Sequence, residues 1–213
     1  MQFRKKHAAL ISALSCLAIL AACKTSVPAQ TIVEVTDSSF RCLHQMTKVR
    51  GMYVDNLLGN LQDTLAVASS ADGGTYPPGT VVQLFPGEAM VKREKGASPA
   101  SNDWEFFLLD VSQQGAKIKE RGFGPERPAN MFGSCFSCHS QAAPKWDMIC
   151  EDDHGCAPIV FPGGINTPVL TSALQKTDKR CSPPEPLTPE ELAELKKLQD
   201  ILAAQAAAAG GQP

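Results

Sequence analysis

The chain has 213 residues, of which 43% are hydrophobic and 20% charged, and its formal net charge is −2. This length fits one domain with appendages and allows a sizeable buried core. Nucleic-acid binding requires a basic surface, which this charge balance does not supply, so we expect no nucleic-acid partner.

The N-terminus is typical of an exported protein. A basic stretch at positions 4–6 precedes an apolar run over residues 8–22, which ends in small side chains. The run is too short for a comfortable membrane span, which needs about 20 apolar residues. Residues 20–23 read Leu-Ala-Ala-Cys and resemble a bacterial lipobox, in which Cys23 is lipidated and becomes the first mature residue. The alternative is an ordinary signal peptide in which Cys23 has no role.

A lipidated Cys23 would attach the chain to a membrane, since each buried CH2 contributes about 0.8 kcal/mol. Lys24 follows it, and resemblance to other lipoproteins then favours the outer membrane over the inner one. We therefore expect a lipid-anchored protein on the periplasmic side of the cell envelope. Removal of residues 1–22 as a lipoprotein signal peptide takes away three basic residues and changes the formal net charge from −2 to −5.

The first predicted elements are a tether and a helix. Residues 23–37 are polar, aperiodic and contain a proline, as expected for a tether. Between about residues 38 and 69 apolar positions recur at steps of three and four, which predicts an amphipathic helix interrupted at Gly51 or Gly59. These positions are Phe40, Leu43, Met46, Val49, Tyr53, Leu57, Leu61 and Leu65.

The middle of the chain predicts strands. Residues 80–85 and 88–93 are β-rich and are separated by a Pro-Gly turn, and residues 104–111 are apolar on both faces, as in a central strand. Residues 116–121 complete a fourth strand. Strands at this spacing form an antiparallel meander more easily than a parallel sheet. The predicted fold class is α+β, with an antiparallel sheet of about four to five strands and flanking helices.

One of those helices, expected to begin near Asn130, carries the sequence Cys-Phe-Ser-Cys-His at residues 135–139. Two thiols about one helical turn apart reach the two vinyl edges of a porphyrin, and the adjacent His faces the iron. We therefore predict that Cys135, Cys138 and His139 bind one covalent haem c, with His139 as the iron ligand.

Three other interpretations of this pair stay open. The cysteines could form a thioredoxin-like redox pair, although the parallel βαβ pattern of that motif is not seen here. They could bind zinc with Cys150, His154 or Cys156 as further ligands. They could also be plain disulfide partners.

The other cysteines are expected to pair in the oxidising periplasm. The chain has eight cysteines, of which Cys16 leaves with the signal and Cys23 takes the lipid. If haem takes two more, four remain, and the simplest pairing is a local bridge between Cys150 and Cys156. That pairing leaves Cys42 to bond with Cys181.

The C-terminal part begins without periodicity and ends in a helix. Residues 157–187 hold six prolines, and residues 188–191, Thr-Pro-Glu-Glu, are a capping-box start. A helix follows with Leu192, Leu195, Leu198 and Leu202 on one face, before an Ala-rich tail. The predicted organisation is therefore a haem c domain over residues 38–182, and a helix with a flexible tail over 183–213.

The late position of the haem motif resembles the cytochrome P-460 and cytochrome c′-beta family. The residues that carry this resemblance are 76–80 (Tyr-Pro-Pro-Gly-Thr), 89–92 (Ala-Met-Val-Lys), 102–106 (Asn-Asp-Trp-Glu-Phe) and 135–139, within about 70 residues from Tyr76 to Met148. The resemblance implies a mainly antiparallel β domain. It also implies an open iron position that binds nitric oxide and similar diatomics, or that oxidises hydroxylamine.

Oxidising members of this family have a Lys cross-linked to the haem and an acidic residue on its distal side. Residues 80–85 contain no Lys, and Lys92 is the nearest candidate for the cross-link. The alternative is that Lys92 is an ordinary solvent-exposed Lys on a strand. Ala143 occupies the position four residues after His139, where a distal acid would be expected. Asp147 could supply the acid instead, and the alternative is that Asp147 is an exposed charge on the surface of a helix. We therefore expect no cross-linked hydroxylamine oxidase.

The sixth iron ligand is the remaining question. The candidates are Met90, Met131, Met148, His44 and His154, and each Met is more often core filler. We expect a five-coordinate iron under an apolar cover that includes Leu84, Phe85 and Met90. The predicted ligand is a small diatomic or nitrogen oxide, with a redox partner protein. The alternatives are a six-coordinate electron-transfer cytochrome and a non-haem, disulfide-stabilised envelope lipoprotein.

Overall fold

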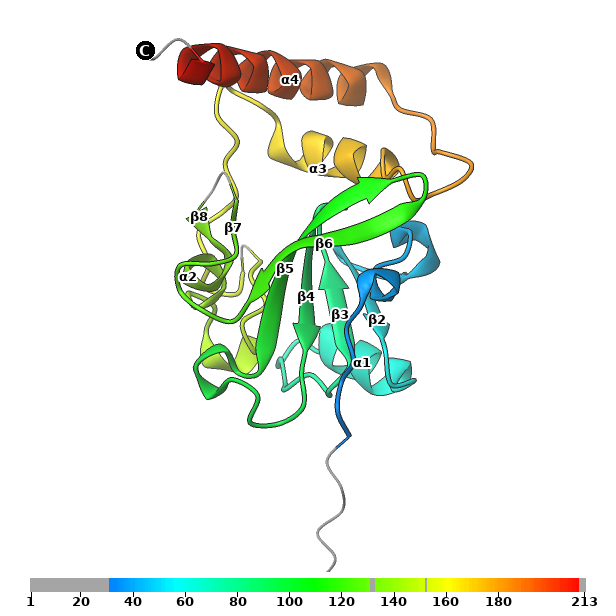
Figure 1. The fold of residues 1–213 in the computed structure, drawn as a ribbon, viewed down its shortest axis with the longest axis vertical. Coiled ribbons are helices and arrows are strands. Elements are labelled where there is room, and N and C mark those ends of the chain that lie inside the picture. The colour runs from blue at the N-terminus through cyan, green and yellow to red at the C-terminus, as the bar shows by residue number, and fades with distance from the viewer. Residues whose placement is uncertain (1–30, 131–132, 152, 211–213) are drawn as a thin grey trace, which may run out of the picture. The chain divides into compact units, whose positions relative to one another are not determined.

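Six antiparallel strands form the central sheet, and each strand pairs with the next one along the chain (Figure 1). They are β1 (Thr47–Val49), β2 (Met52–Asn56), β3 (Thr80–Gln83), β4 (Glu88–Lys92), β5 (Trp104–Ser112) and β6 (Gly115–Gly122). A separate two-stranded sheet contains β7 (Ala129–Asn130) and β8 (Gly133–Ser134). The predicted α+β class and the antiparallel meander are confirmed.

The computed structural model describes residues 31–130, 133–151 and 153–210. The predicted signal, Cys23 and most of the predicted tether lie outside these residues, as does Met131. In the described part of the chain, no helix has the length and apolar character needed to cross a membrane.

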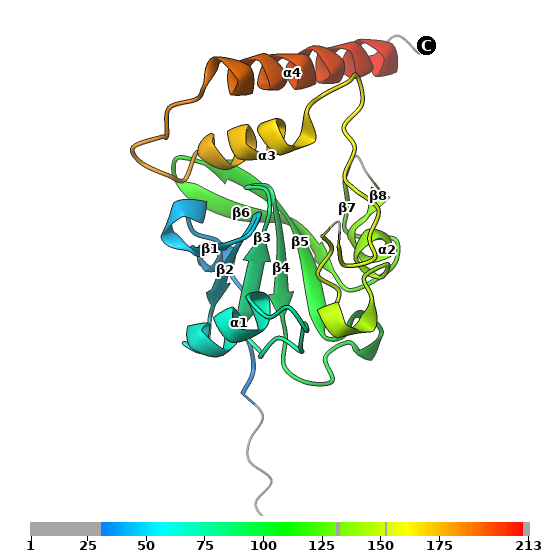
Figure 2. The ribbon, with the colours of Figure 1, turned by 180° about the vertical axis from the view of Figure 1, so that it is seen from behind.

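Within the described residues, four α-helices accompany the sheet: α1 (Leu61–Ala68), α2 (Cys135–His139), α3 (Thr167–Lys176) and α4 (Pro189–Gly210). Figures 1 and 2 show α3 and α4 next to each other beyond one end of the sheet, and α2 beside β7 and β8. From the side drawn in Figure 2, α1 lies in front of the sheet.

The sheet is covered on both faces because alternate side chains of a strand point to opposite sides. On one face, residues such as Phe107 and Val91 pack against the N-terminal segment that contains Phe40 and Leu43. On the other face, Met90 and Phe106 belong to a core with residues of α1 and α2 and with the segment after them. This second face positions the candidate site.

The predicted helix over residues 38–69 is confirmed only after Gly59, as α1, and is wrong for the residues before it. The structure has two 3-10 turns, Asp37–Ser39 and Leu43–Gln45, then the β1–β2 hairpin, and only then α1. Val49 pairs with Met52 across a two-residue turn, in which Arg50 has φ 52°. The hairpin adds two strands, so the predicted count of four to five is too low.

The strands predicted between residues 80 and 121 are confirmed as β3 to β6, with small differences at their ends. The C-terminal helix is also confirmed, and its capping box is complete. The Glu191 carboxylate accepts from the Thr188 backbone N–H at 2.8 Å, and the Thr188 hydroxyl accepts from the Glu191 N–H at 3.2 Å.

The packed face of α4 differs from the predicted one. Leu195, Leu198 and Ile201 pack toward α3, whereas Leu192 and Leu202 are 54% and 44% exposed. The helix α3 was not expected within residues 157–187. Asn166 caps it by accepting from the Val169 N–H.

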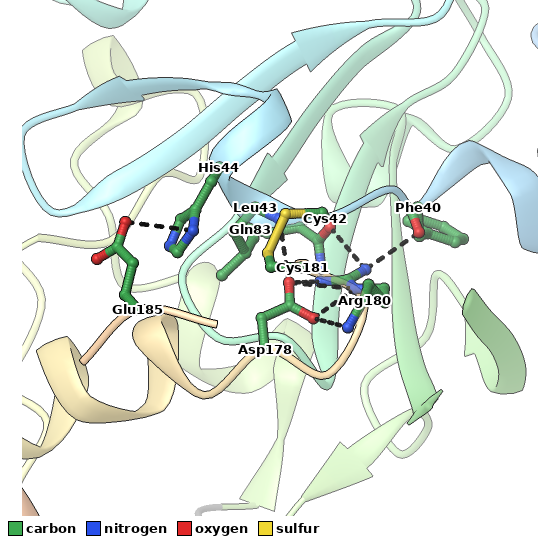
Figure 3. Close-up of a disulfide and its surroundings, with 9 residues drawn as sticks. All are labelled: Phe40, Cys42, Leu43, His44, Gln83, Asp178, Arg180, Cys181 and Glu185. Carbon is green, nitrogen blue, oxygen red and sulfur yellow. Dashed lines mark hydrogen bonds and ion pairs between the residues drawn. A yellow bond between two sulfur atoms is a disulfide. The ribbon is translucent and has the colours of Figure 1, made fainter. Parts of the chain in front are cut away.

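A disulfide joins Cys42 to Cys181 and thereby connects the N-terminal segment to the chain after α3 (Figure 3). Beside it, the Asp178 carboxylate accepts from the Leu43 backbone N–H at 3.0 Å and forms an ion pair with Arg180 at 2.8 Å. A second disulfide joins Cys150 to Cys156. These are the two pairs that the sequence predicts.

Candidate functional site

The candidate site is built around α2. Its N-cap is Ser134, whose hydroxyl accepts from the Ser137 N–H at 3.3 Å. The helix begins later than the predicted start near Asn130, because that residue is in β7 and Gly133, with φ 109°, is in β8. The three predicted site residues, Cys135, Cys138 and His139, all lie in α2 and line one cavity.

This cavity has a volume of about 760 Å³, within the range of about 300–1,000 Å³ typical of small-molecule and cofactor sites. The side of the cavity next to the sheet is mostly apolar, with Met52, Val82, Ala89, Met90, Phe106 and Phe107 from the strands and Leu84 and Phe85 from the turn between β3 and β4. Residues of α3, among them Thr171 and Gln175, contribute a polar wall, and the Cys150–Cys156 disulfide lies on another side.

His139 has a defined hydrogen bond. Its Nδ1 lies 2.8 Å from the carbonyl oxygen of Met148. Because a carbonyl only accepts, Nδ1 carries the proton, and a neutral ring then has its lone pair on Nε2. Burial lowers the pKa of His139, which favours the neutral ring. The ring also packs on Phe106, with 5.4 Å between ring centroids.

Cys135 and Cys138 are the free cysteines among the described residues, and both are half-buried. Burial and the nearby Glu88 raise the pKa of Cys135 to about 11, and the same causes raise that of Cys138. A reactive redox pair needs a lowered thiol pKa. The surroundings of these thiols therefore argue against the thioredoxin-like interpretation.

The zinc interpretation lacks its further ligands. Cys150 and Cys156 are bonded to each other, and His154 is stacked on Trp146 with ring centroids 3.7 Å apart. Over the described ranges, two groups of three side chains have metal-ligating atoms close together. They are Cys42, His44 and Cys181, whose sulfurs are bonded, and Glu151, Asp153 and His154. Neither group includes a cysteine of α2.

Lys92 and Asp147 occupy a different place from the predicted one. They are 5% and 3% exposed, and Lys92 Nζ lies 2.7 Å from Asp147 Oδ2. Neither residue lines the cavity. Burial lowers the pKa of Lys92, and the hydrogen bonds that Lys92 donates to Asp147 oppose that shift. Both alternatives considered for these residues, a solvated strand Lys and a helix-surface Asp, are therefore wrong.

Among the sixth-ligand candidates that the structure describes, Met90 lines the cavity. Met148 lies in the core and offers its carbonyl to His139, while His44 pairs with Glu185 at 3.3 Å. Met52 also lines the cavity. Sequence reasoning missed it because the β1–β2 hairpin was predicted to be helix.

Sequence reasoning also missed Glu88, a carboxylate that lines the cavity. Its Oε1 accepts from Asn130 Nδ2 at 2.8 Å, and burial raises its pKa. A Glu at the start of a strand gives no local signal of burial. Lys48 and Arg50, exposed on the missed hairpin, line the cavity as well.

No protein-family model, no curated protein and no solved structure matches this chain. The assignment of a function therefore rests on the residues of the site.

Proposed function

We propose that the chain is a c-type haem protein, with haem attached at Cys135 and Cys138 and ligated by His139. The observation that carries this proposal is the arrangement of α2. Two free thiols line the same cavity of about 760 Å³ as His139, whose Nδ1 donates to a carbonyl and whose Nε2 therefore keeps its lone pair. A plain disulfide pair would need neither this His nor the cavity.

The residues present fit this cofactor. Attachment requires thiols that add across vinyl groups, and both cysteines are free and reach the cavity. The apolar part of the wall suits the macrocycle, and the exposed cation of Lys48 suits its carboxylates. The second cation, Arg50, is paired with Glu151 at 2.6 Å. The hydrogen bond between His139 and Met148 fixes the ring tautomer, as is usual for a metal-ligating His.

When bound, the haem would supply a redox-active iron that can bind a small ligand. The chain determines which ligands reach the iron. Met90, Phe85 and Leu84 line the cavity, and such apolar side chains exclude water and favour neutral diatomics. This supports the binding of nitric oxide or a similar small ligand, as the resemblance to the cytochrome P-460 and cytochrome c′-beta family implies.

The cross-linked hydroxylamine oxidase of that family is not supported. Lys92 is held in a buried ion pair with Asp147 and lies away from the cavity wall. Glu88 is a carboxylate that lines the cavity, so an acidic side chain is present there although Ala143 does not supply one. The argument against the oxidase therefore depends on Lys92.

A six-coordinate electron-transfer cytochrome is the second candidate function. One observation favours it: two thioethers, those of Met52 and Met90, belong to residues that line the cavity. A Met ligand would fill the sixth position and leave electron transfer to a redox partner protein as the role.

We also propose that the protein is exported and lipid-anchored at Cys23, on the periplasmic side of the outer membrane. The two disulfides support an oxidising compartment, because such bonds are rare where thiols are kept reduced.

The spectrum of the reduced protein, with and without carbon monoxide, tests the two haem functions. The full chain is expressed with a cytochrome c maturation system. An open iron position binds carbon monoxide at once and shifts the Soret band, which is the result we expect. A wild-type spectrum that carbon monoxide leaves unchanged would contradict the open site. In that case Met52→Leu and Met90→Leu identify the ligand, with Met46→Leu as the control, because Met46 is buried in the core on the other face of the sheet and does not line the cavity.

A further inference from the structure

Two consecutive residues after α2 have an unusual backbone conformation. Asp147 has φ 49° and Met148 has φ 65°, so both are left-handed although neither is Gly. This conformation is unfavourable for an L-residue and persists where the surroundings hold it. The pair follows the 3-10 turn Pro144–Trp146, and the Met148 carbonyl lies 2.8 Å from His139 Nδ1.

Buried side chains of the sheet hold Asp147 in this conformation. Lys92 of β4 donates to both carboxylate oxygens, at 2.7 and 2.8 Å. Trp104 of β5 donates its indole N–H to the Asp147 carbonyl at 2.7 Å. The Tyr76 backbone N–H donates to Oδ2 at 2.8 Å. All four residues are buried.

Stability alone does not explain this ion pair. Two buried charges lose their hydration, and an apolar pair of similar volume is often as stable or more stable. A fixed carboxylate, in contrast, determines the direction of the peptide that follows it. That peptide contains the Asp147 carbonyl, which accepts from Trp104, and the Met148 carbonyl that accepts from His139 belongs to the next peptide unit.

We propose that Lys92, Asp147 and Trp104 form a positioning network for His139. The network fixes the Met148 carbonyl, which in turn fixes the tautomer and orientation of the imidazole. This inference rests on the proposed function, because it takes His139 as the iron ligand. It gives Lys92 a role that excludes a cross-link to haem.

The network should change the properties of the iron. A ligating His that donates a strong Nδ1–H hydrogen bond is a more basic ligand. It strengthens the bond between iron and Nε2 and favours the ferric state. Loss of the hydrogen bond should therefore lower the iron–His stretching frequency of the ferrous protein and raise its midpoint potential.

The test uses Asp147→Asn, Lys92→Met and Trp104→Phe in the full chain matured with haem. The third variant removes one hydrogen bond and no charge, so it covers the case in which the first two fail to fold. Glu105→Gln is the matched control. Glu105 is also buried on β5 and forms ion pairs with Arg93 and Arg121, on the opposite face from Trp104.

We expect all three variants to keep covalent haem, to show a lower iron–His stretching frequency in resonance Raman spectra, and to have a higher midpoint potential. Trp104→Phe should shift both values least. Glu105→Gln should leave both unchanged. Unchanged values in the three variants, or equal shifts in the control, would overturn the network.

A second readout separates this inference from the proposed function. If the wild-type chain takes up no haem, the proposed function fails, but the network remains testable in the haem-free chain. NMR of the imidazole should show a proton on His139 Nδ1 that exchanges slowly with water in wild type and in Glu105→Gln. It should exchange rapidly in Asp147→Asn and Trp104→Phe. Slow exchange in these variants would contradict the network.

Discussion

The cysteines of this chain occupy two kinds of surroundings. Cys42 and Cys181 are buried and bonded to each other, beside an ion pair of Asp178 and Arg180 whose carboxylate also holds a backbone N–H (Figure 3). Cys135 and Cys138 are half-buried, unpaired and open to a cavity. The sulfur atoms of Cys42 and Cys181 therefore have a structural role, which is to join two segments of the chain. The surroundings of Cys135 and Cys138 leave room for a ligand.

The difference shows that a cysteine's neighbours indicate its role better than its spacing does. Spacing alone leaves a redox pair, a zinc site, a disulfide and haem attachment open for Cys135 and Cys138. The raised thiol pKa values argue against a redox pair, and the cavity and the hydrogen-bonded His139 support the proposed haem attachment. Substitutions at both kinds of site can break or sharpen this comparison.

The largest expected effect on stability is at the Cys42–Cys181 disulfide. Cys42→Ala/Cys181→Ala should lower the free energy of unfolding by about 4 kcal/mol, because the bond closes a long loop and restricts the unfolded chain. The two cysteines are 139 residues apart. Urea denaturation of the haem-free chain measures this, and a loss below about 1 kcal/mol would show that the bond is not structural.

The second disulfide closes a shorter loop, with a separation of six residues. Cys150→Ala/Cys156→Ala should therefore cost less, about 2 kcal/mol. Peptide mapping under non-reducing conditions should recover the Cys150–Cys156 and Cys42–Cys181 links from wild type. A Cys42–Cys150 link would show both pairings to be wrong.

Substitution of Glu191, which forms a cap and an ion pair in place of a disulfide, should lower the free energy of unfolding by less than loss of either disulfide. Glu191 caps α4 and pairs with Lys176, whose hydrogen bond holds the pKa of Glu191 at about 2. Glu191→Gln should cost about 1 kcal/mol at pH 7. A carboxyl with a lowered pKa stabilises the fold above its unfolded pKa of about 4.3. The difference from wild type should therefore shrink as pH falls from about 5 to 2, and a constant difference in acid titrations would contradict the ion pair.

The smallest expected change in stability is at the α2 cysteines, Cys135 and Cys138. In the haem-free chain, Cys135→Ala/Cys138→Ala should alter the free energy of unfolding by less than about 1 kcal/mol, since these cysteines are half-buried and unpaired. A loss as large as that of Cys42→Ala/Cys181→Ala would remove the contrast between the two sites. It would mean that the α2 cysteines are structural.

Part of the fold could be predicted because its signals are local. The strands from Thr80 to Gly122 are β-rich runs between turn residues, and Thr188 with Glu191 is a capping box. The first hairpin could not be predicted in this way. Its strand β2 is buried on both faces, with Tyr53 in one core and Val54 in the other, so its apolar residues also fit a helical period. In α3, Asn166 with Pro168 was a start signal that the many prolines concealed.

The candidate site, too, has a part that local sequence signals predict and a part that they do not. Its attachment motif occupies five consecutive residues and is visible in the sequence. Its walls come from distant segments, and nothing local shows that Met52 and Glu88 line a cavity. Lys92 and Asp147 are 55 residues apart, and each alone reads as a surface charge. Only the folded chain brings them together.

Covalent attachment of haem is the central claim, and extraction with acidified acetone tests it most directly. The full chain is expressed with a cytochrome c maturation system, beside the Cys135→Ala/Cys138→Ala variant. We predict that haem remains with the wild-type polypeptide and that haem associated with the variant passes into the organic phase. Haem extracted from the wild-type chain, or a wild-type chain that acquires none, would contradict the account.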